Sequence, residues 1–286
     1  MRLRVRSVVR AVVAGAAVVA LGGAMSGCSA SSEGATVDPG PTYAAQAEVR
    51  ASGAAGYRDG TPTAELPDPA WLDAVASATG IPRRALQGYA GAAIASNEMR
   101  PECHLGWNTL AGIGWVESHH GTIFGGSILD SGVTSAPIIG VPLDGNGFQE
   151  IPDTDAGAVD GDTEWDRAVG PMQFVPATWA AWASEANGDG VPDINNVDDS
   201  SLSAAEYLCF SAGRVGSVGD GGSGGDGGSG GDGGSGGDAA PGDLGTEAGW
   251  RAAIAGYNES PAYLDEVLDY ANRYAAEAAQ ALDAVG

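Results

Sequence analysis

Lysine is absent from this sequence of 286 residues, and the cationic side chains at neutral pH are 13 arginines. The acidic residues number 37, so the formal charge is −24. A surface this acidic repels nucleic acid and anionic lipid headgroups. Nucleic acid is therefore excluded as a partner, and the charge by itself names no substrate.

Long hydrophobic runs are also scarce. The one extended apolar stretch covers residues 11–24, follows an arginine-rich start and precedes Cys28. It is too short for a permanent membrane-spanning helix and has the layout of a secretory signal. The segment resembles a bacterial lipoprotein signal, in which residues 1–27 are removed and Cys28 becomes the lipidated N-terminus. The alternative is a plain secretory signal with an incidental cysteine.

The lipoprotein interpretation places the mature protein outside the cytoplasm, anchored by lipid to the cell membrane and facing the cell wall. Removal of the signal leaves nine arginines against the same 37 acidic residues, a formal charge of −28. We expect a soluble, acidic, monomeric protein on that tether.

Cysteine is rare, with three residues in the whole chain. If Cys28 carries lipid, Cys103 and Cys209 remain, and an oxidising compartment favours a disulfide between them. Such a bond would close a loop of about a hundred residues and contribute roughly 4 to 5 kcal/mol in the chain-entropy model. Two buried free thiols are the alternative.

Two stretches have the composition of unstructured chain. Residues 28–65 are rich in Ala, Ser, Gly, Thr and Pro and are predicted to form a flexible tether. Residues 216–238 repeat a Gly-Gly-Ser-Gly-Gly-Asp unit and are predicted to form a disordered surface loop, which adds little closure entropy. Residues 66–286, with this loop inside them, form a single predicted domain.

Within that domain the apolar residues recur mostly at helical spacing, so the predicted fold class is mainly α. Predicted helices begin at Pro69 and Pro82 and cover about 108–118, 176–186, 202–210, 247–257 and 261–282. Trp179, Trp182 and Trp250 fall at core positions of these helices. Residues 121–169 carry Gly, Pro, Asp and short β-branched runs, and predict an irregular insert with a small β hairpin.

Glu117 ends a largely apolar helical segment, Asn108 to Ser118. Partial desolvation of a carboxyl group there raises its pKa, and a protonated glutamate near neutral pH can act as a general acid. Taken alone, the pattern fits a solvated glutamate at a helix end better than a catalytic one.

Four short motifs change that balance. They are Glu117-Ser118 with Gly121; Gly170-Pro171-Met172-Gln173-Phe174 with Pro176 and Thr178-Trp179; Ala204 to Cys209; and Ala255-Gly256-Tyr257-Asn258 with Ser260 and Tyr263. In this order they resemble the motifs of lytic transglycosylases and goose-type lysozymes, most closely the membrane-bound lytic murein transglycosylase B type in its actinobacterial form.

The resemblance implies a lysozyme-like fold and a peptidoglycan substrate. Glu117 would protonate the oxygen of the β-1,4 bond between N-acetylmuramic acid and N-acetylglucosamine. The same carboxylate would then accept the proton of the muramic acid 6-hydroxyl, giving a 1,6-anhydro product. No cofactor is required, and one carboxyl group suffices where ordinary glycosidases use two.

The motifs also supply the residues expected at the substrate. Gln173 would hydrogen-bond the sugar or Glu117, and Tyr257 would lie near Glu117 and affect its protonation or orient the acetamido group. Gly170 would let the backbone approach the glycan. Ser118 would bind a substrate hydroxyl or brace the helix end. The full expected set is Ser118, Gly170, Met172, Gln173, Tyr257 and Asn258; for Gln173 and Tyr257, plain packing is the alternative.

Metal binding has one candidate loop. Glu185, Asn187, Asp189, Val191 and Asp193 place oxygens at alternate positions, with glycine in the sixth place, which resembles part of a structural calcium loop. The twelfth position is an asparagine instead of the expected glutamate. A polar turn that caps the next helix is the alternative. The histidines at positions 104, 119 and 120 do not have the spacing of a catalytic zinc site.

Two rival functions remain open from the sequence. A hydrolytic muramidase of the same fold would need a second carboxylate opposite Glu117. The insert offers such groups and is expected to form a wall of the glycan groove; they are Asp130, Asp144, Asp153, Asp155 and Asp160. The other rival is a non-catalytic lipoprotein that binds the cell wall.

Overall fold

The computed structural model describes residues 41–53, 56–58, 60–147, 149–214 and 242–284. The predicted signal segment, Cys28 and the predicted glycine-rich loop at 216–238 lie outside the described residues. None of the described helices is both long and apolar enough to cross a bilayer.

The prediction of a mainly α fold is confirmed. Seven α-helices are described: α1 (Pro69–Thr79), α2 (Arg83–Met99), α3 (Trp107–Ser118), α4 (Pro176–Trp182), α5 (Val197–Ala212), α6 (Glu247–Tyr257) and α7 (Pro261–Asp283). Three short 3-10 turns accompany them: η1 (Thr63–Glu65), η2 (Pro101–Cys103) and η3 (Ile123–Gly125). In the described part of the chain, strand pairing is limited to isolated bridges, so the expected hairpin is reduced to single pairings.

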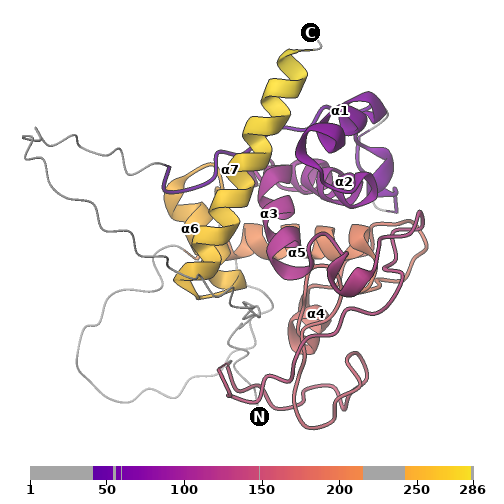
Figure 1. Cartoon of the computed structure of the whole chain (residues 1–286), viewed down its shortest axis with the longest axis vertical. Helices are drawn as coiled ribbons and strands as arrows, with labels where there is room; N and C mark the ends of the chain where they lie inside the picture. The colour runs from indigo at the N-terminus through magenta and orange to yellow at the C-terminus, as the bar shows by residue number, and fades with distance from the viewer. Residues whose placement is uncertain (1–40, 54–55, 59, 148, 215–241, 285–286) are drawn as a thin grey trace, which may run out of the picture.

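Helix α3 lies at the centre of the molecule, with α7 beside it and α2 and α5 around it (Figure 1). Ten of its twelve residues are buried, as expected for a helix that is apolar all round. Gly112 lets α7 approach closely, since a Cβ there would lie 2.9 Å from the carbonyl oxygen of Val267. The central position of α3 fixes the position of the glutamate at its end.

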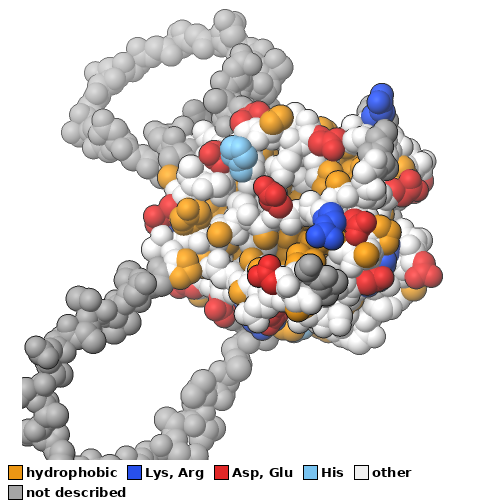
Figure 2. All heavy atoms as spheres, turned by 90° about the horizontal axis from the view of Figure 1, so that it is seen from above, with side chains coloured by type: hydrophobic (Ala, Val, Ile, Leu, Met, Phe, Trp, Pro, Cys, Tyr) orange, Lys and Arg blue, Asp and Glu red, His pale blue; other side chains and the backbone are white. Residues whose placement is uncertain are grey.

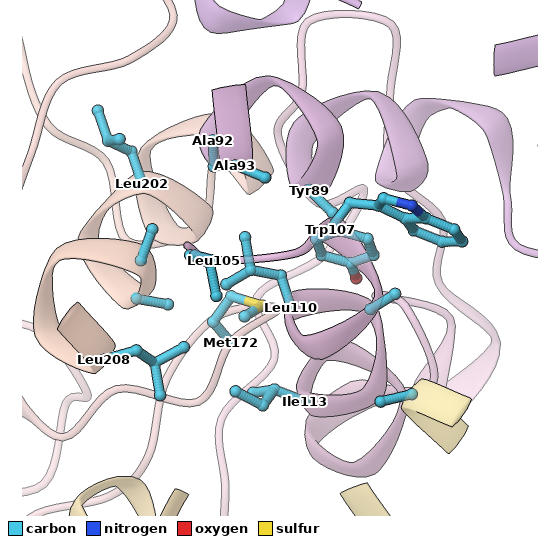
Figure 3. Close-up of a cluster of buried hydrophobic side chains, with 14 of the residues drawn as sticks. Tyr89, Ala92, Ala93, Leu105, Trp107, Leu110, Ile113, Met172, Leu202 and Leu208 are labelled. Atoms are coloured by element: carbon cyan, nitrogen blue, oxygen red, sulfur yellow. The ribbon is translucent and has the colours of Figure 1, made fainter. Parts of the chain in front are cut away.

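The hydrophobic core joins α2, α3 and α5. Figure 3 shows side chains from these helices and from the segment before α4 meeting around Leu110 and Met172, both with no exposed surface. Trp250, one of the tryptophans predicted to lie in the core, is fully buried, and Trp179 is 9% exposed. Trp182 is only partly buried and packs its ring against Tyr207 and Phe210.

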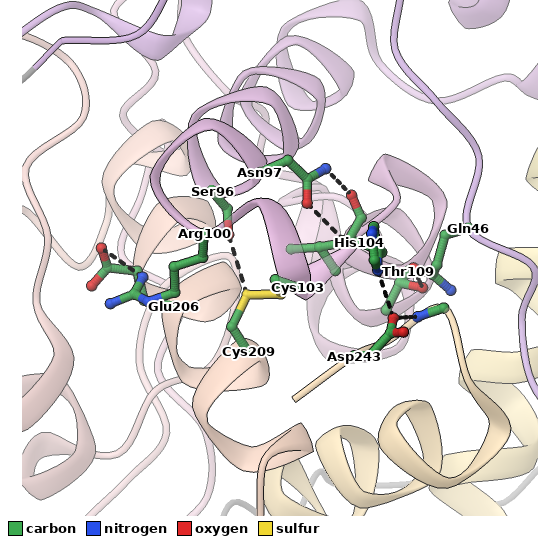
Figure 4. The surroundings of a disulfide bond; sticks show 12 residues. Gln46, Ser96, Asn97, Arg100, Cys103, His104, Thr109, Glu206, Cys209 and Asp243 are labelled. Carbon is green, nitrogen blue, oxygen red and sulfur yellow. Dashed lines mark hydrogen bonds and ion pairs between the residues drawn. A yellow bond between two sulfur atoms is a disulfide. The ribbon is translucent and has the colours of Figure 1, made fainter. Parts of the chain in front are cut away.

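The predicted disulfide between Cys103 and Cys209 is present and joins η2 to α5 across 106 positions of sequence (Figure 4). Both cysteines are fully buried. The covalent link therefore ties the end of the α2 region to the helix that packs against it.

Residues 41–53 pack on the domain, although composition predicts a flexible tether over residues 28–65. Asn108, near the start of α3, donates to the carbonyl of Ala45 and accepts from the N–H of Ala47. The small side chains that give this segment a linker-like composition also let its backbone lie flat against the helix. The flexible tether over residues 28–65 stays a prediction, and its residues 41–53 lie against the domain through these bonds.

Residues 121–169 form the irregular insert that the sequence predicts between α3 and α4; apart from η3 and isolated bridges, its described residues have no regular secondary structure (Figure 1). Its aspartates organise it locally: Asp155 accepts from the N–H groups of Gly157 and Val159, and Asp160 accepts from those of Asp162 and Arg167. On the face seen in Figure 2, the acidic side chains are spread over the surface rather than gathered in one patch.

Candidate active site

Glu117 occupies the last turn of α3, and three successive residues with left-handed backbone end the helix immediately after it. These are His119, His120 and Gly121, with φ of 50°, 59° and 78°. The N–H of His120 closes the helix end on the carbonyl of Gly114 at 2.8 Å. The sharp stop holds Glu117 at the edge of the core instead of extending the helix into solvent.

The carboxyl group of Glu117 is almost completely enclosed, with 6% of the residue exposed. The hydroxyl of Tyr263, in the first turn of α7, donates to its Oε1 at 2.6 Å. Burial raises the pKa of Glu117 to about 8; the Tyr263 hydrogen bond opposes this shift, and the charge of Glu266 adds to it. The group therefore keeps its proton at neutral pH.

Ser118 braces the helix end. Its hydroxyl donates to the carbonyl of Pro171 at 2.6 Å and accepts from the N–H of Gly121 at 2.8 Å. The residue has no exposed surface. Of the two roles expected for Ser118, the structure places it in the bracing one, which joins α3 to the turn at residues 170–174.

A glycine is needed at position 170 because another part of the protein backbone lies very close to it. Its φ is +82°, and a Cβ would lie 2.0 Å from the carbonyl oxygen of Ile194. Its N–H donates to the carbonyl of Ile138 at 2.8 Å. The glycine is required by tight packing between this turn and the segment that leads into α5, and the expected approach of the glycan to Gly170 stays a prediction.

Met172 and Tyr257 connect the same turn to α6. The side chain of Met172 lies in the core, and its carbonyl accepts from the Tyr257 hydroxyl at 2.8 Å. Burial raises the pKa of Tyr257 well above its ordinary value, with the charge of Glu117 contributing, so the phenol stays a donor. Tyr257 thus lies near Glu117, as expected, but in the described structure it bonds the turn that faces the glutamate.

Gln173 has a left-handed backbone, with φ of 50°, and is 8% exposed. Its amide N–H₂ donates to the carbonyls of Gly170 at 2.9 Å and Ile138 at 3.3 Å. In the structure the side chain of Gln173 bonds the main chain, and its expected hydrogen bond to the sugar or to Glu117 stays a prediction.

Asn258 shapes the connection between α6 and α7. It is 2% exposed, and its Oδ1 accepts from the N–H of Ser260, the residue before α7. This turn sets the start of α7, and with it the position of Tyr263. Asn258 therefore lies behind the site rather than at its surface.

Tyr263 is the site residue that sequence reasoning missed. It stands in the fourth motif, which was the available signal, but nothing in the motif says which of its two tyrosines meets the glutamate. The contact joins residues 146 positions apart and depends on how α3 packs against α7. Tyr263 is fully buried, and burial together with the charge of Glu117 holds its pKa well above the ordinary value.

The surface of the insert contains a hollow. A cavity of about 540 Å³ lies there, and its wall consists of Ile139, Gly140, Asp160, Gly161, Asp162, Thr163 and Arg167. Arg167 spans it by donating to Asp162 and to the carbonyl of Gly140. Within the described part of the chain, the carboxylate whose charge acts on Glu117 is Glu266 of α7 rather than an aspartate of the insert.

The predicted calcium loop has the hydrogen bonds of a polar turn. Asn187 accepts from the N–H of Asp189, and Asp189 accepts from that of Val191. The buried Asp199, in the first turn of α5, accepts from Ala186, Asn187 and Asp193 N–H groups, and burial raises its pKa to about 6. These contacts agree with the capping alternative; calcium binding by Glu185, Asn187, Asp189, Val191 and Asp193 stays a prediction.

Another cluster of acidic residues brings its carboxylate oxygens close enough together to hold a cation. Asp153, Asp155 and Asp166 of the insert have carboxylate oxygens within 4.8 Å of one another. The oxygens are already engaged by N–H groups and by the Thr154 hydroxyl. The arrangement is explained by the turns that it stabilises.

Comparison with known families gives one result. Residues 152–213 match the family model of the transglycosylase SLT domain. The matched stretch covers the turn at 170–174 and α5, that is, the second and third motifs. No curated protein and no solved structure gave a significant match.

This match supports the lytic transglycosylase family and, in general terms, a peptidoglycan-degrading enzyme. The mainly α fold with its central helix and irregular insert is lysozyme-like. Glu117, Tyr257 and Tyr263 lie outside the matched residues, so their roles are argued from the geometry alone.

Proposed function

We propose that this protein is a lytic transglycosylase that cleaves the β-1,4 bond between N-acetylmuramic acid and N-acetylglucosamine in peptidoglycan, with Glu117 as its acid and base. The observation that carries the proposal is the carboxyl group of Glu117, 6% exposed at the end of α3 and with a pKa raised to about 8. A carboxylic acid that keeps its proton at neutral pH can protonate a leaving glycosidic oxygen.

The reaction would proceed in two steps. Glu117 donates its proton to the glycosidic oxygen as the bond to the muramic acid C1 breaks, and the N-acetyl group of that sugar stabilises the developing positive charge. The Glu117 carboxylate then takes the proton of the muramic acid 6-hydroxyl as that oxygen attacks C1. The proton is returned to Glu117, the product has a 1,6-anhydro ring, and no water is consumed.

Tyr263 suits both steps. Its hydroxyl donates to Oε1 at 2.6 Å, which leaves Oε2 to exchange the proton with the substrate. The same hydrogen bond stabilises the carboxylate that forms after the first step. The buried turn at residues 170–174, tied to α3 through Ser118, keeps the end of the helix in place.

Hydrolysis is the second candidate, and one contact favours it. The charge of Glu266 acts on Glu117, so a second carboxyl group is present on α7 near the acid. If Glu266 activated a water molecule, the product would carry a reducing end. A non-catalytic wall-binding protein has less support, because such a protein needs no buried acid.

The proposed setting is the cell wall. We place the mature protein outside the cytoplasm, attached to the membrane through lipid on Cys28, acting as a monomer of the membrane-bound B type in wall turnover. This part rests on the sequence patterns alone.

Mass spectrometry of digested peptidoglycan tests the proposal. The parent protein should release muropeptides with 1,6-anhydro ends, and the Glu117→Gln variant should release none above background. Reducing ends in place of anhydro ends, lost in Glu266→Gln, would establish hydrolysis instead. Release at the parent rate by Glu117→Gln would refute the role of Glu117.

A further inference from the structure

Phe124 combines two unfavourable features. It is 82% exposed, the highest value among the exposed large hydrophobic residues of the described chain. Its backbone has φ of 62°, a left-handed conformation that is strained for a residue with a Cβ and that glycine or asparagine adopts more readily. Neither exposure of the ring nor the strain stabilises the fold, and backbone strain of this kind concentrates at functional sites.

Phe124 follows Glu117 by seven residues, and hydrogen-bonded turns lie between them. The N–H of Gly121 donates to the Ser118 hydroxyl at 2.8 Å, which returns the chain to the helix end that carries Glu117. Two further turns follow, in which the Thr122 N–H donates to the His119 carbonyl and the Gly125 N–H to the Thr122 carbonyl. The backbone around Phe124 is thus fixed, while its ring projects into solvent.

The chemistry of the surroundings selects the ligand. An aromatic ring on an acidic surface is a poor contact for anionic lipid, because the chain has 37 acidic residues against 13 arginines. A pyranose ring is uncharged and presents a face of C–H groups, which an aromatic face contacts by dispersion and by its quadrupole. Among ligands expected beside Glu117, an N-acetylated sugar ring fits this platform.

We infer that Phe124 is a stacking subsite for one N-acetylated sugar ring of the glycan strand, adjacent to the bond at Glu117. The inference rests on the proposed function, since it assigns to Phe124 a part of the same substrate. It predicts that the ring contributes to glycan binding and that its backbone strain is retained for this purpose.

Binding is measured in the Glu117→Gln background, so that no cleavage interferes. The probe is the β-1,4-linked hexamer of N-acetylglucosamine, followed by isothermal titration calorimetry. Adding Phe124→Gly or Phe124→Asn should raise Kd about tenfold, the effect of losing one aromatic contact. Phe124→Trp should keep parent affinity. Met99→Ala, which removes an apolar side chain 40% exposed on α2, is the matched control and should change nothing.

Thermal stability separates a binding role from a structural one. Glycine and asparagine relieve the left-handed strain, so Tm of Phe124→Gly and Phe124→Asn should equal or exceed that of the parent. A fall of several degrees in Tm together with weaker binding would show that the ring is structural and overturn the inference. Unchanged Kd in both variants would overturn it as well.

The two proposals can fail separately. If the parent cleaves peptidoglycan and Glu117→Gln binds the hexamer, but the Phe124 variants bind it equally well, only the subsite is wrong. If the parent releases no muropeptides and Glu117→Gln does not bind the hexamer, the proposed function fails and the subsite fails with it.

Discussion

At the scale of single residues, the site consists of one acid and one donor. Burial disfavours the charged form of the Glu117 carboxyl group, so the group holds its proton, and the hydroxyl of Tyr263 partly offsets this effect. The two effects oppose each other, so the pKa of Glu117 lies where the group can both give and regain a proton near neutral pH.

Tyr263→Phe removes the hydrogen bond that lowers the pKa of Glu117, so this pKa should rise further above about 8. The alkaline limb of the pH–rate profile for muropeptide release should move to higher pH. The maximal rate should fall, because the carboxylate formed in the first step loses its donor. The aromatic ring is kept in this variant, so the packing of α7 is preserved. If the alkaline limb did not move, the Tyr263 hydroxyl would have no effect on the pKa of Glu117, and the prediction would be wrong.

Glu117→Gln should make the protein more stable at high pH. The pKa of Glu117 is raised from 4.5 to about 8 on folding, so the folded state binds its proton more tightly than the unfolded state. The contribution of this group to the free energy of unfolding is therefore fully present below the unfolded pKa, and it is lost as pH rises from 4.5 towards 8. Glutamine does not titrate.

Melting curves across pH check this prediction. At a pH just below 4.5, the ordinary pKa of glutamate, the parent and Glu117→Gln should have similar Tm values. As the pH rises to about 8, the Tm of the variant should increasingly exceed that of the parent. A constant gap at every pH would mean that the glutamate does not titrate with a raised pKa.

How far residues could be predicted depends on whether their role is local. Glu117 ends an apolar helix in the sequence itself, and its burial follows from that position. Tyr263 and Gly170 depend on contacts between segments that are distant in sequence, and so does the bond from Gln173 to Ile138. The motifs contain all three residues but do not indicate their partners. Tyr263 bonds Glu117, Gly170 packs against the carbonyl of Ile194, and Gln173 bonds two main-chain carbonyls.

At the scale of elements, the turn at residues 170–174 connects the parts of the site. It accepts hydrogen bonds from Ser118 at the end of α3 and from Tyr257 of α6. Through Gly170 it also packs against the segment leading into α5. A shift of this turn would displace the end of α3 and the glutamate with it.

Gly170→Ala should destabilise the protein by about 3 kcal/mol or more, because it adds a backbone clash to left-handed strain. Its Cβ would lie 2.0 Å from the Ile194 carbonyl oxygen. Gly80→Ala is the control: φ is +71° and the space is open, so its cost should be about 1 kcal/mol. Chemical denaturation measures both; equal costs would contradict the packing described for this turn.

Helix boundaries show which local signals were sufficient. Prolines at the first turns of α1, α4 and α7 predicted where these helices begin, but α4 ends at Trp182 rather than at the predicted 186. Helix α5 begins at Val197, earlier than the predicted 202, because the Asn196 side chain caps it and two aspartates occupy its first turn. The first turn of α5 is polar, so apolar spacing did not indicate that the helix begins there.

At the scale of the whole molecule, the disulfide is a covalent constraint between two distant segments. Cys103 and Cys209 are separated by 106 positions, so the bond restricts a large part of the unfolded chain. The chain-entropy model gives about 5 kcal/mol for such a loop. Serine at both positions should lower Tm by roughly ten degrees or more.

Differential scanning calorimetry with and without reductant checks this effect. Reductant should lower Tm of the parent once the buried bond is broken and should leave the double serine variant unchanged. Equal melting of the parent and the double serine variant without reductant would contradict a stabilising bond.

The sequence predicted the mainly α fold class of the molecule, and composition gave no sign of the hydrogen bonds made by residues 41–53. Helical spacing was enough for a mainly α fold, and the paucity of regular patterns at 121–169 predicted the irregular insert. Residues 41–53 read as linker because they are small, yet Asn108 and Gln46 join them to α3 through main-chain and side-chain hydrogen bonds. Composition measures hydrophobicity and does not detect such backbone docking.

The central claim is that the enclosed side chain of Glu117 holds its proton at neutral pH. A ¹³C NMR titration of the Glu117 side-chain carboxyl, assigned by comparison with Glu117→Gln, measures this directly. The account predicts a midpoint near pH 8, where the pKa is raised by burial. A midpoint close to the ordinary value of 4.5 would contradict it.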